Sequence, residues 1–129
     1  MIDRKKIFNK FNGKCAYCGE KLSRMQVDHI IPKRSFKKIV LKKYKVPEFL
    51  THLTGNDIDH EDNLFPACGT CNKWKSDYSL ETFRSELGKQ TERLNLRSSN
   101  YRMAKRYGQL METENEIIFY FELYKYHKL

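Results

Sequence analysis

Two Cys-x-x-Cys pairs constrain the fold of this chain more than any other feature of its sequence. Cys15 and Cys18 form the first pair, Cys68 and Cys71 form the second, and together they use every cysteine in the chain. Thiolates spaced in this way bind one Zn²⁺ in tetrahedral geometry, and a set of four leaves no open coordination position. The pattern therefore predicts a structural zinc that ties together two segments distant in the sequence.

Length and composition indicate one small globular domain over residues 1–129. A hydrophobic fraction of 40% predicts a modest core, for which a metal staple is well suited. Residues 1–8 lack the apolar stretch of a secretory signal, and no apolar run is long enough to span a membrane. We therefore expect a cytoplasmic protein with reduced thiols, which favours metal ligation over the alternative of two disulfides.

The charge of the chain favours a polyanionic partner. The formal net charge is +9, although many proteins that bind no nucleic acid share such a balance. Residues 33–45 carry seven basic side chains and no acidic one, interleaved with apolar residues at helical spacing. We expect a basic helical insertion over 33–53 that contacts DNA; the alternative is a solvated helix that covers the core. The candidate phosphate contacts are Lys33, Arg34, Lys37, Lys38, Lys42 and Lys43.

Local patterns predict an α+β fold. Apolar residues at helical spacing predict a helix over 3–11, and alternation predicts a strand over 25–31 that Pro32 stops. A second strand over 64–67 leads into the second cysteine pair and a helix that starts near 70–72. The C-terminal extension, 79–129, is predicted to contain a helix capped by Ser79, a helix over 98–110 and a last strand over 116–121.

Four short motifs follow one another in an order that resembles the HNH nuclease family. They are Cys15-x-x-Cys18, Asp28-His29-Ile30-Ile31-Pro32, Asn63-Leu64 and Cys68-x-x-Cys71-Asn72-x-x-Lys75. The resemblance covers residues 13–77 and implies a ββα-metal core, in which two short antiparallel strands and a helix hold one divalent cation. The resemblance also implies a metal-dependent endonuclease that hydrolyses phosphodiester bonds of DNA, expected to be double-stranded.

The resemblance assigns a role to each polar residue of these motifs. Asp28 and Asn72 would bind the catalytic Mg²⁺ or Mn²⁺, a hard cation that prefers oxygen ligands. His29 would be the general base that takes a proton from water, and Asn63 would fix its imidazole. Lys75 is a candidate phosphate contact, or an ordinary lysine of the helix surface.

Two departures from the family pattern stand out. Asn72 occupies a position that is often His in the family, and 33 residues separate His29 from Asn63, more than in the compact form of the motif. The surplus is the basic insertion. Because one such site cuts one strand, a double-strand break requires a homodimer, a larger assembly or two events.

Other interpretations of the same residues remain open. An Asp-His pair such as Asp28-His29 is often a surface or capping pair, and Asn63 can be a turn residue. His60 is a further candidate metal ligand, although its acidic loop is more typical of a solvent-exposed segment. The main alternative function is a non-catalytic zinc module that binds nucleic acid.

Overall fold

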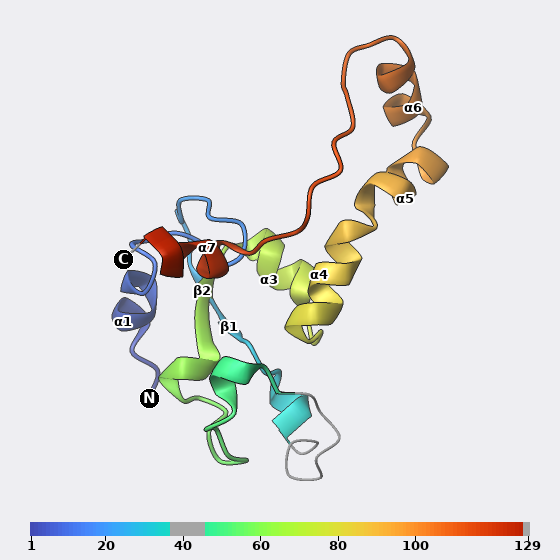
Figure 1. The fold of residues 1–129 in the computed structure, drawn as a ribbon. Helices are drawn as coiled ribbons and strands as arrows, with labels where there is room; N and C mark the ends of the chain where they lie inside the picture. Colours follow the sequence, from blue (N-terminus) through green and yellow to red (C-terminus); the bar gives the residue numbers. More distant parts are fainter. Residues whose placement is uncertain (37–45, 128–129) are drawn as a thin grey trace.

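The structure is a computed structural model that describes residues 1–36 and 46–127 (Figure 1). It is an α+β fold with one small sheet, as the sequence predicted. None of its helices in these two ranges is long and apolar enough to cross a membrane. The helices and strands are α1 (Arg4–Asn9), β1 (Gln26–His29), β2 (Leu64–Ala67), α3 (Gly69–Lys75), α4 (Leu80–Gly88), α5 (Gln90–Arg97), α6 (Ser99–Arg106) and α7 (Tyr120–His127), with short 3₁₀ helices η1 (Lys33–Ser35), η2 (Glu48–Leu50) and η3 (Glu61–Asn63).

The two strands pair antiparallel, with Asp28 opposite Phe65 and His29 opposite Leu64. Every residue of β2 is buried, whereas β1 is buried at Asp28 alone. This difference follows from the sequence, because β2 is an unbroken apolar run and β1 alternates. The predicted strands at 25–31 and 64–67 are therefore confirmed in place and in pairing.

Helix α3 starts directly after β2, at the second cysteine pair. The Sγ of Cys68 caps the helix by accepting a hydrogen bond from the backbone N–H of Cys71 at 3.3 Å. Helix α3 lies beside β1 (Figure 1). The chain order β1, β2, α3 thus places one short helix against the strand that carries Asp28 and His29.

The aromatic core centres on Tyr17, which lies in the first cysteine pair, between Cys15 and Cys18. Its ring lies edge-on to Phe65, Phe83 and Phe119, at centroid distances of 5.9, 5.5 and 5.4 Å. The C-terminal segment contributes Phe119 and Phe121 to this core, and both are buried. Backbone N–H groups of Tyr120 and Phe121 donate to the carbonyls of Tyr17 and Ala16 at 2.9 and 2.8 Å. These hydrogen bonds join the start of α7 to the segment between Cys15 and Cys18.

The extension beyond α3 differs in part from its prediction. Helix α4 is capped by Ser79 as expected, and α6 falls within the predicted 98–110 helix. Helix α5 was not predicted. The predicted strand at 116–121 is wrong: 110–119 form no regular structure, and α7 starts at Tyr120. An apolar run fits a strand or a buried segment equally well, and here tertiary packing of its aromatic rings decides.

The basic insertion is described only in part. Residues 33–35 and 48–50 form the short helices η1 and η2, and Leu50 and Leu53 are buried in the core. The predicted insertion helix and the candidate contacts Lys37, Lys38, Lys42 and Lys43 lie outside the described residues.

Candidate functional site

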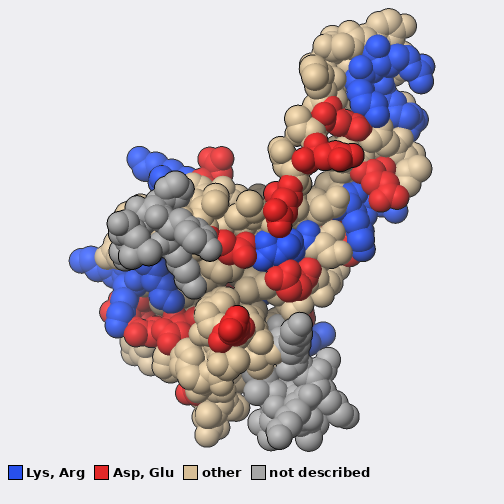
Figure 2. All heavy atoms as spheres, in the orientation of Figure 1, with Lys and Arg blue, Asp and Glu red and all other residues tan. Residues whose placement is uncertain are grey.

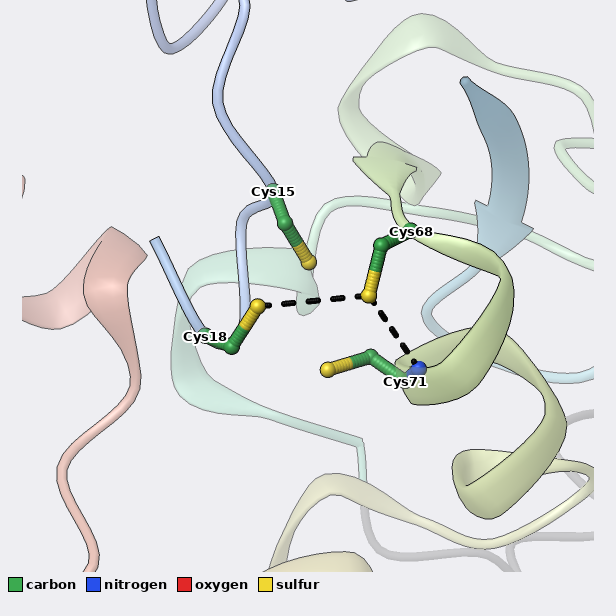
Figure 3. Close-up of side chains that lie close together, drawn as sticks. All are labelled: Cys15, Cys18, Cys68 and Cys71. Carbon is green, nitrogen blue, oxygen red and sulfur yellow. Dashed lines mark hydrogen bonds between the residues drawn. The ribbon is translucent and has the colours of Figure 1, made fainter. Parts of the chain in front are cut away.

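The four cysteines converge at one place, as Figure 3 shows. Their Sγ atoms all lie within 4.8 Å of one another, and Cys18 and Cys68 are 3.9 Å apart at sulfur. All four are free thiols, so the alternative of two disulfides does not apply to this structure. Two thiols come from the first cysteine pair and two from the start of α3, which matches the predicted ligand set. The donor set fits a tetrahedral zinc.

Crowding of the four thiols has electrostatic consequences. The hydrogen bond from Cys71 lowers the pKa of Cys15 to about 4, whereas burial raises the pKa of Cys18 to about 11. The pKa of Cys71 is also raised, chiefly because its thiol donates a hydrogen bond to Cys15. Neighbouring thiolates repel one another, and a dication placed among them removes that repulsion.

Asp28 is buried in the middle of β1, with 4% of its surface exposed. The Tyr17 hydroxyl donates a hydrogen bond to its Oδ2, and the Lys75 ammonium lies 3.2 Å from the same oxygen. Burial raises the pKa of Asp28, and the nearby Lys75 charge opposes that rise. Within 1–36 and 46–127, no hydrogen bond or ion pair reaches the other oxygen, Oδ1. One buried carboxylate oxygen is therefore left for a further ligand.

Lys75 is fully buried, which corrects the expectation that it contacts a phosphate. Its Nζ donates a 3.0 Å hydrogen bond to the carbonyl of His29 in addition to its ion pair with Asp28. Burial lowers the pKa of Lys75, and the Asp28 charge partly restores it. The lysine thus fastens the last turn of α3 to the end of β1.

Asn72 lies one turn before Lys75 on α3 and faces the same strand. Its Nδ2 donates to Oε1 of Gln26 at 2.6 Å, and Gln26 and Asp28 share one face of β1 because they are two residues apart. Its Oδ1 accepts no hydrogen bond from the part of the chain that the structure describes. Asn72 and Asp28 therefore both lie along the contact between β1 and α3.

His29 ends β1 and is half-buried. Its Nε2 lies 2.7 Å from Oδ1 of Asp59, in the loop before η3. Asp59 is exposed, and its hydrogen bond from His29 lowers its pKa. A carboxylate can only accept, so Nε2 donates and a neutral imidazole carries its lone pair on Nδ1. Sequence reasoning missed Asp59, because nothing in its acidic loop distinguishes it from the neighbouring acidic residues.

Asn63 is fully buried at the end of η3, and it contacts backbone rather than the imidazole. Its Oδ1 accepts from the N–H of Ile31 at 2.8 Å, and its Nδ2 donates to the carbonyls of Ile31 and Ile58 at 3.2 and 3.0 Å. Its own carbonyl accepts from the N–H of Ile30 at 2.9 Å. Asn63 therefore holds the backbone that follows His29 and the loop that carries Asp59.

The other candidate residues lie at the surface. Lys33 and Arg34 are exposed on η1, and Arg34 forms an ion pair with Asp77 at 3.2 Å. His60 lies with His52 and Asp62 in a second, exposed group of metal-ligand types. In that group His52 Nε2 bonds Asp62 at 2.8 Å, and His60 Nδ1 caps η3 by accepting from the N–H of Asp62. These side chains are already paired with one another.

Comparison with known proteins points to the same family as the motifs. Over 79 residues, 61% of this chain, the sequence is 35% identical to the "SPbeta prophage-derived putative HNH endonuclease YoqL" of Bacillus subtilis (strain 168). The resemblance to HNH endonucleases is thereby confirmed. The matched part spans 30% of that relative's length. No family model matches the chain, and no solved structure matches it.

Proposed function

We propose that this chain is an HNH-type, metal-dependent endonuclease that hydrolyses phosphodiester bonds of DNA. In this proposal β1, β2 and α3 form the ββα-metal core, and the four cysteines hold a structural zinc at its base. The zinc has no open position and supplies no chemistry. The reaction would take place where β1 meets α3.

The observation that carries the proposal is the Oδ1 of the buried Asp28, which has no hydrogen-bond or ion-pair partner among residues 1–36 and 46–127. A buried carboxylate oxygen without a hydrogen bond is costly, and a bound cation is one way to compensate it. Asn72 offers an amide oxygen from α3, so the two residues supply the hard oxygen ligands that Mg²⁺ or Mn²⁺ prefers. The remaining positions of such a cation are suited to water and phosphate oxygens. When bound, it would neutralise charge on the scissile phosphate and on the leaving oxygen.

His29 would act as the general base. The hydrogen bond from Nε2 to Asp59 leaves Nδ1 to accept a proton from water, and Asp59 would stabilise the imidazolium that results. Asn63 would position this pair through the backbone, because it binds the segments that follow His29 and precede Asp59. This role replaces the direct contact with the imidazole that the motif suggests.

The substrate is proposed to be double-stranded DNA, contacted in part by the exposed Lys33 and Arg34 and by lysines 37, 38, 42 and 43. The net charge of +9 supports a polyanion, and the relative's name supports a nuclease. A single site would nick one strand, so linear products would need a second protomer or a second event.

A non-catalytic zinc module is the second candidate, and the ion pair between Asp28 and Lys75 favours it. A carboxylate that already has a buried lysine partner can serve as scaffold alone. Such a module would bind DNA in a salt-dependent manner without turnover.

Plasmid cleavage distinguishes the two candidates. Zinc-loaded protein is incubated with supercoiled plasmid and Mg²⁺ or Mn²⁺, beside the variant His29→Ala and the matched control His52→Ala. We expect nicking by the wild type and by His52→Ala, and a loss of about 10²–10⁴-fold in rate for His29→Ala. Equal nicking by both variants would remove His29 from the mechanism. Binding without any nicking would support the zinc module.

A further inference from the structure

Helices α5 and α6 form an arm that has almost no core of its own. Neither helix contains a buried residue, and α5 contacts the rest of the fold mainly through α4. Figure 1 shows the two helices extending away from the sheet, with the chain returning to α7 as an extended segment. We define residues 89–111 as the α5–α6 arm. A short helix pair without burial gains little stability from packing, so its position must be fixed in another way.

Polar contacts hold the arm in place. The carboxylate of Glu112 accepts hydrogen bonds from Asn95, Tyr101 and Lys105, the last at 2.9 Å, and these contacts lower the pKa of Glu112 to about 2. Arg102 donates to the backbone carbonyl of Asn95 at 2.8 Å and joins α6 to α5. At the base, Arg93 pairs with Glu86 of α4 at 2.6 Å. The arm is thus ordered without being buried.

The arm is basic. It carries six basic side chains and one acidic side chain, Glu92. Lys89, Arg93 and Lys105 form ion pairs with Glu86 and Glu112, so the charge that is free for a partner lies on the three arginines that remain. Arg97 and Arg106 are exposed at the ends of α5 and α6, and neither has an ion-pair or hydrogen-bond partner among the described residues. In the same described ranges, the Arg102 guanidinium has one partner, the backbone carbonyl of Asn95. Figure 2 shows Lys and Arg side chains gathered at the far end of the arm.

We propose that the α5–α6 arm binds the sugar-phosphate backbone of the DNA, away from the bond that is cut. This inference rests on the proposed function and extends it with a second contact surface. Arg97, Arg102 and Arg106 present guanidinium groups, which match phosphate oxygens in geometry and in charge. Tyr107 directly follows Arg106, has 74% of its surface accessible, and supplies an aromatic ring for sugar or base contacts.

The charge of the arm favours DNA over a second copy of this chain. Exposed apolar side chains such as Leu96 and Tyr107 would also suit a protein interface. However, a symmetric dimer through this surface would bring the same basic residues of both copies together, and like charges repel. Phosphates are complementary to that surface. Helix α4 connects the arm to α3, and α4 and α5 have nine and eight residues, so each is about 12–14 Å long. At this distance from β1 and α3, the arm can contact the DNA backbone several base pairs from the bond that is cut.

The proposal is tested with a charge-matched pair of variants. Arg97→Gln/Arg106→Gln removes two unpaired charges from the arm. Lys5→Gln/Arg24→Gln removes two exposed charges from the N-terminal part of the chain, outside the arm. Both are made in the His29→Ala protein, which keeps its zinc, and binding to a short fluorescent duplex is measured by anisotropy over a range of salt without added Mg²⁺. We expect the arm variant to bind at least tenfold more weakly, with a log–log salt slope about two units shallower. The control should change affinity less than threefold.

Each outcome decides a different point. Equal effects of the two variants would overturn the arm proposal, because net charge alone would then explain the loss. A loss of self-association in the wild-type arm variant, with DNA affinity intact, would assign the arm to a second copy instead. DNA binding and DNA cleavage are measured separately. If the arm variant loses affinity but the wild type never cuts DNA, the proposed function is overturned and the DNA-binding role of the arm still stands.

Discussion

Replacing Lys75 by Met should destabilise the protein more than any change at a nearby surface lysine. Lys75 has no exposed surface, its Nζ lies 3.2 Å from Asp28, and it also donates to the carbonyl of His29. Methionine fills most of the same volume but removes the charge. Asp28 then stays buried, and the Tyr17 hydroxyl is its one remaining side-chain partner in the part of the chain that the structure describes. Removing one partner of a buried ion pair typically costs about 3–5 kcal/mol.

This cost corresponds to a fall in Tm of about 12–20 °C for a chain of this length. The assay is thermal and urea unfolding of zinc-loaded protein, with Lys73→Met as the matched control on the same helix. Lys73 is exposed and has no side-chain partner among the described residues, so its replacement should change stability by less than about 0.5 kcal/mol. A Lys75→Met protein as stable as Lys73→Met would refute the role of the buried ion pair.

The same variant should show a defined pH dependence. Burial already raises the folded-state pKa of Asp28, and losing Lys75 removes the largest influence that lowers it. A carboxyl whose pKa is higher in the folded state stabilises the fold at low pH and loses that contribution as pH rises through the folded value. The stability gap between Lys75→Met and the wild type should therefore narrow from pH 8 toward pH 5.5. A stability gap between the two proteins that widens from pH 8 toward pH 5.5 would contradict this prediction.

Three further predictions follow from other parts of the site. Cys68→Ser, or removal of zinc by a chelator, should unfold the core and reduce the bound zinc from one equivalent per chain; a retained cooperative melting transition at the same Tm would contradict the structural zinc. Asn63→Ala should cost about 2–4 kcal/mol in urea unfolding, because two buried backbone groups of Ile31 lose their partner; a cost below about 1 kcal/mol would show that water replaces the amide. Asp59→Asn should lower the cleavage rate while leaving Tm within about 2 °C, because Asp59 is exposed, and Asp59→Glu should recover part of the rate; a large loss of Tm would instead make Asp59 structural.

Local sequence patterns were sufficient to predict the cysteine cluster and the two strands. Both depend on short-range chemistry: the thiol spacing fixes the ligand set, and β2 is an apolar run between turn residues. The N-cap at Ser79 is likewise a local feature, and the Oγ of Ser79 accepts from the N–H of Thr82 as such a cap requires.

Features that depend on tertiary contacts were not predictable in this way. The residues around Lys75 in the sequence do not indicate that it is buried, because its partner Asp28 is distant along the chain. The strand predicted over 116–121 failed for the same reason, since Phe119 and Phe121 pack around Tyr17 instead of alternating across a sheet. Helix α5 was missed because it has no apolar stripe that a core would require, and polar contacts hold it.

The Mg²⁺ dependence of plasmid cleavage, compared between the wild type and Asn72→Ala, tests the central claim most directly. We expect nicking that requires a divalent cation, stops in EDTA, and needs a higher Mg²⁺ concentration when Asn72 no longer offers its amide oxygen. Cleavage that persists without a divalent cation, or no cleavage by the wild type at any Mg²⁺ or Mn²⁺ concentration, would contradict the assignment of a nuclease site to β1 and α3.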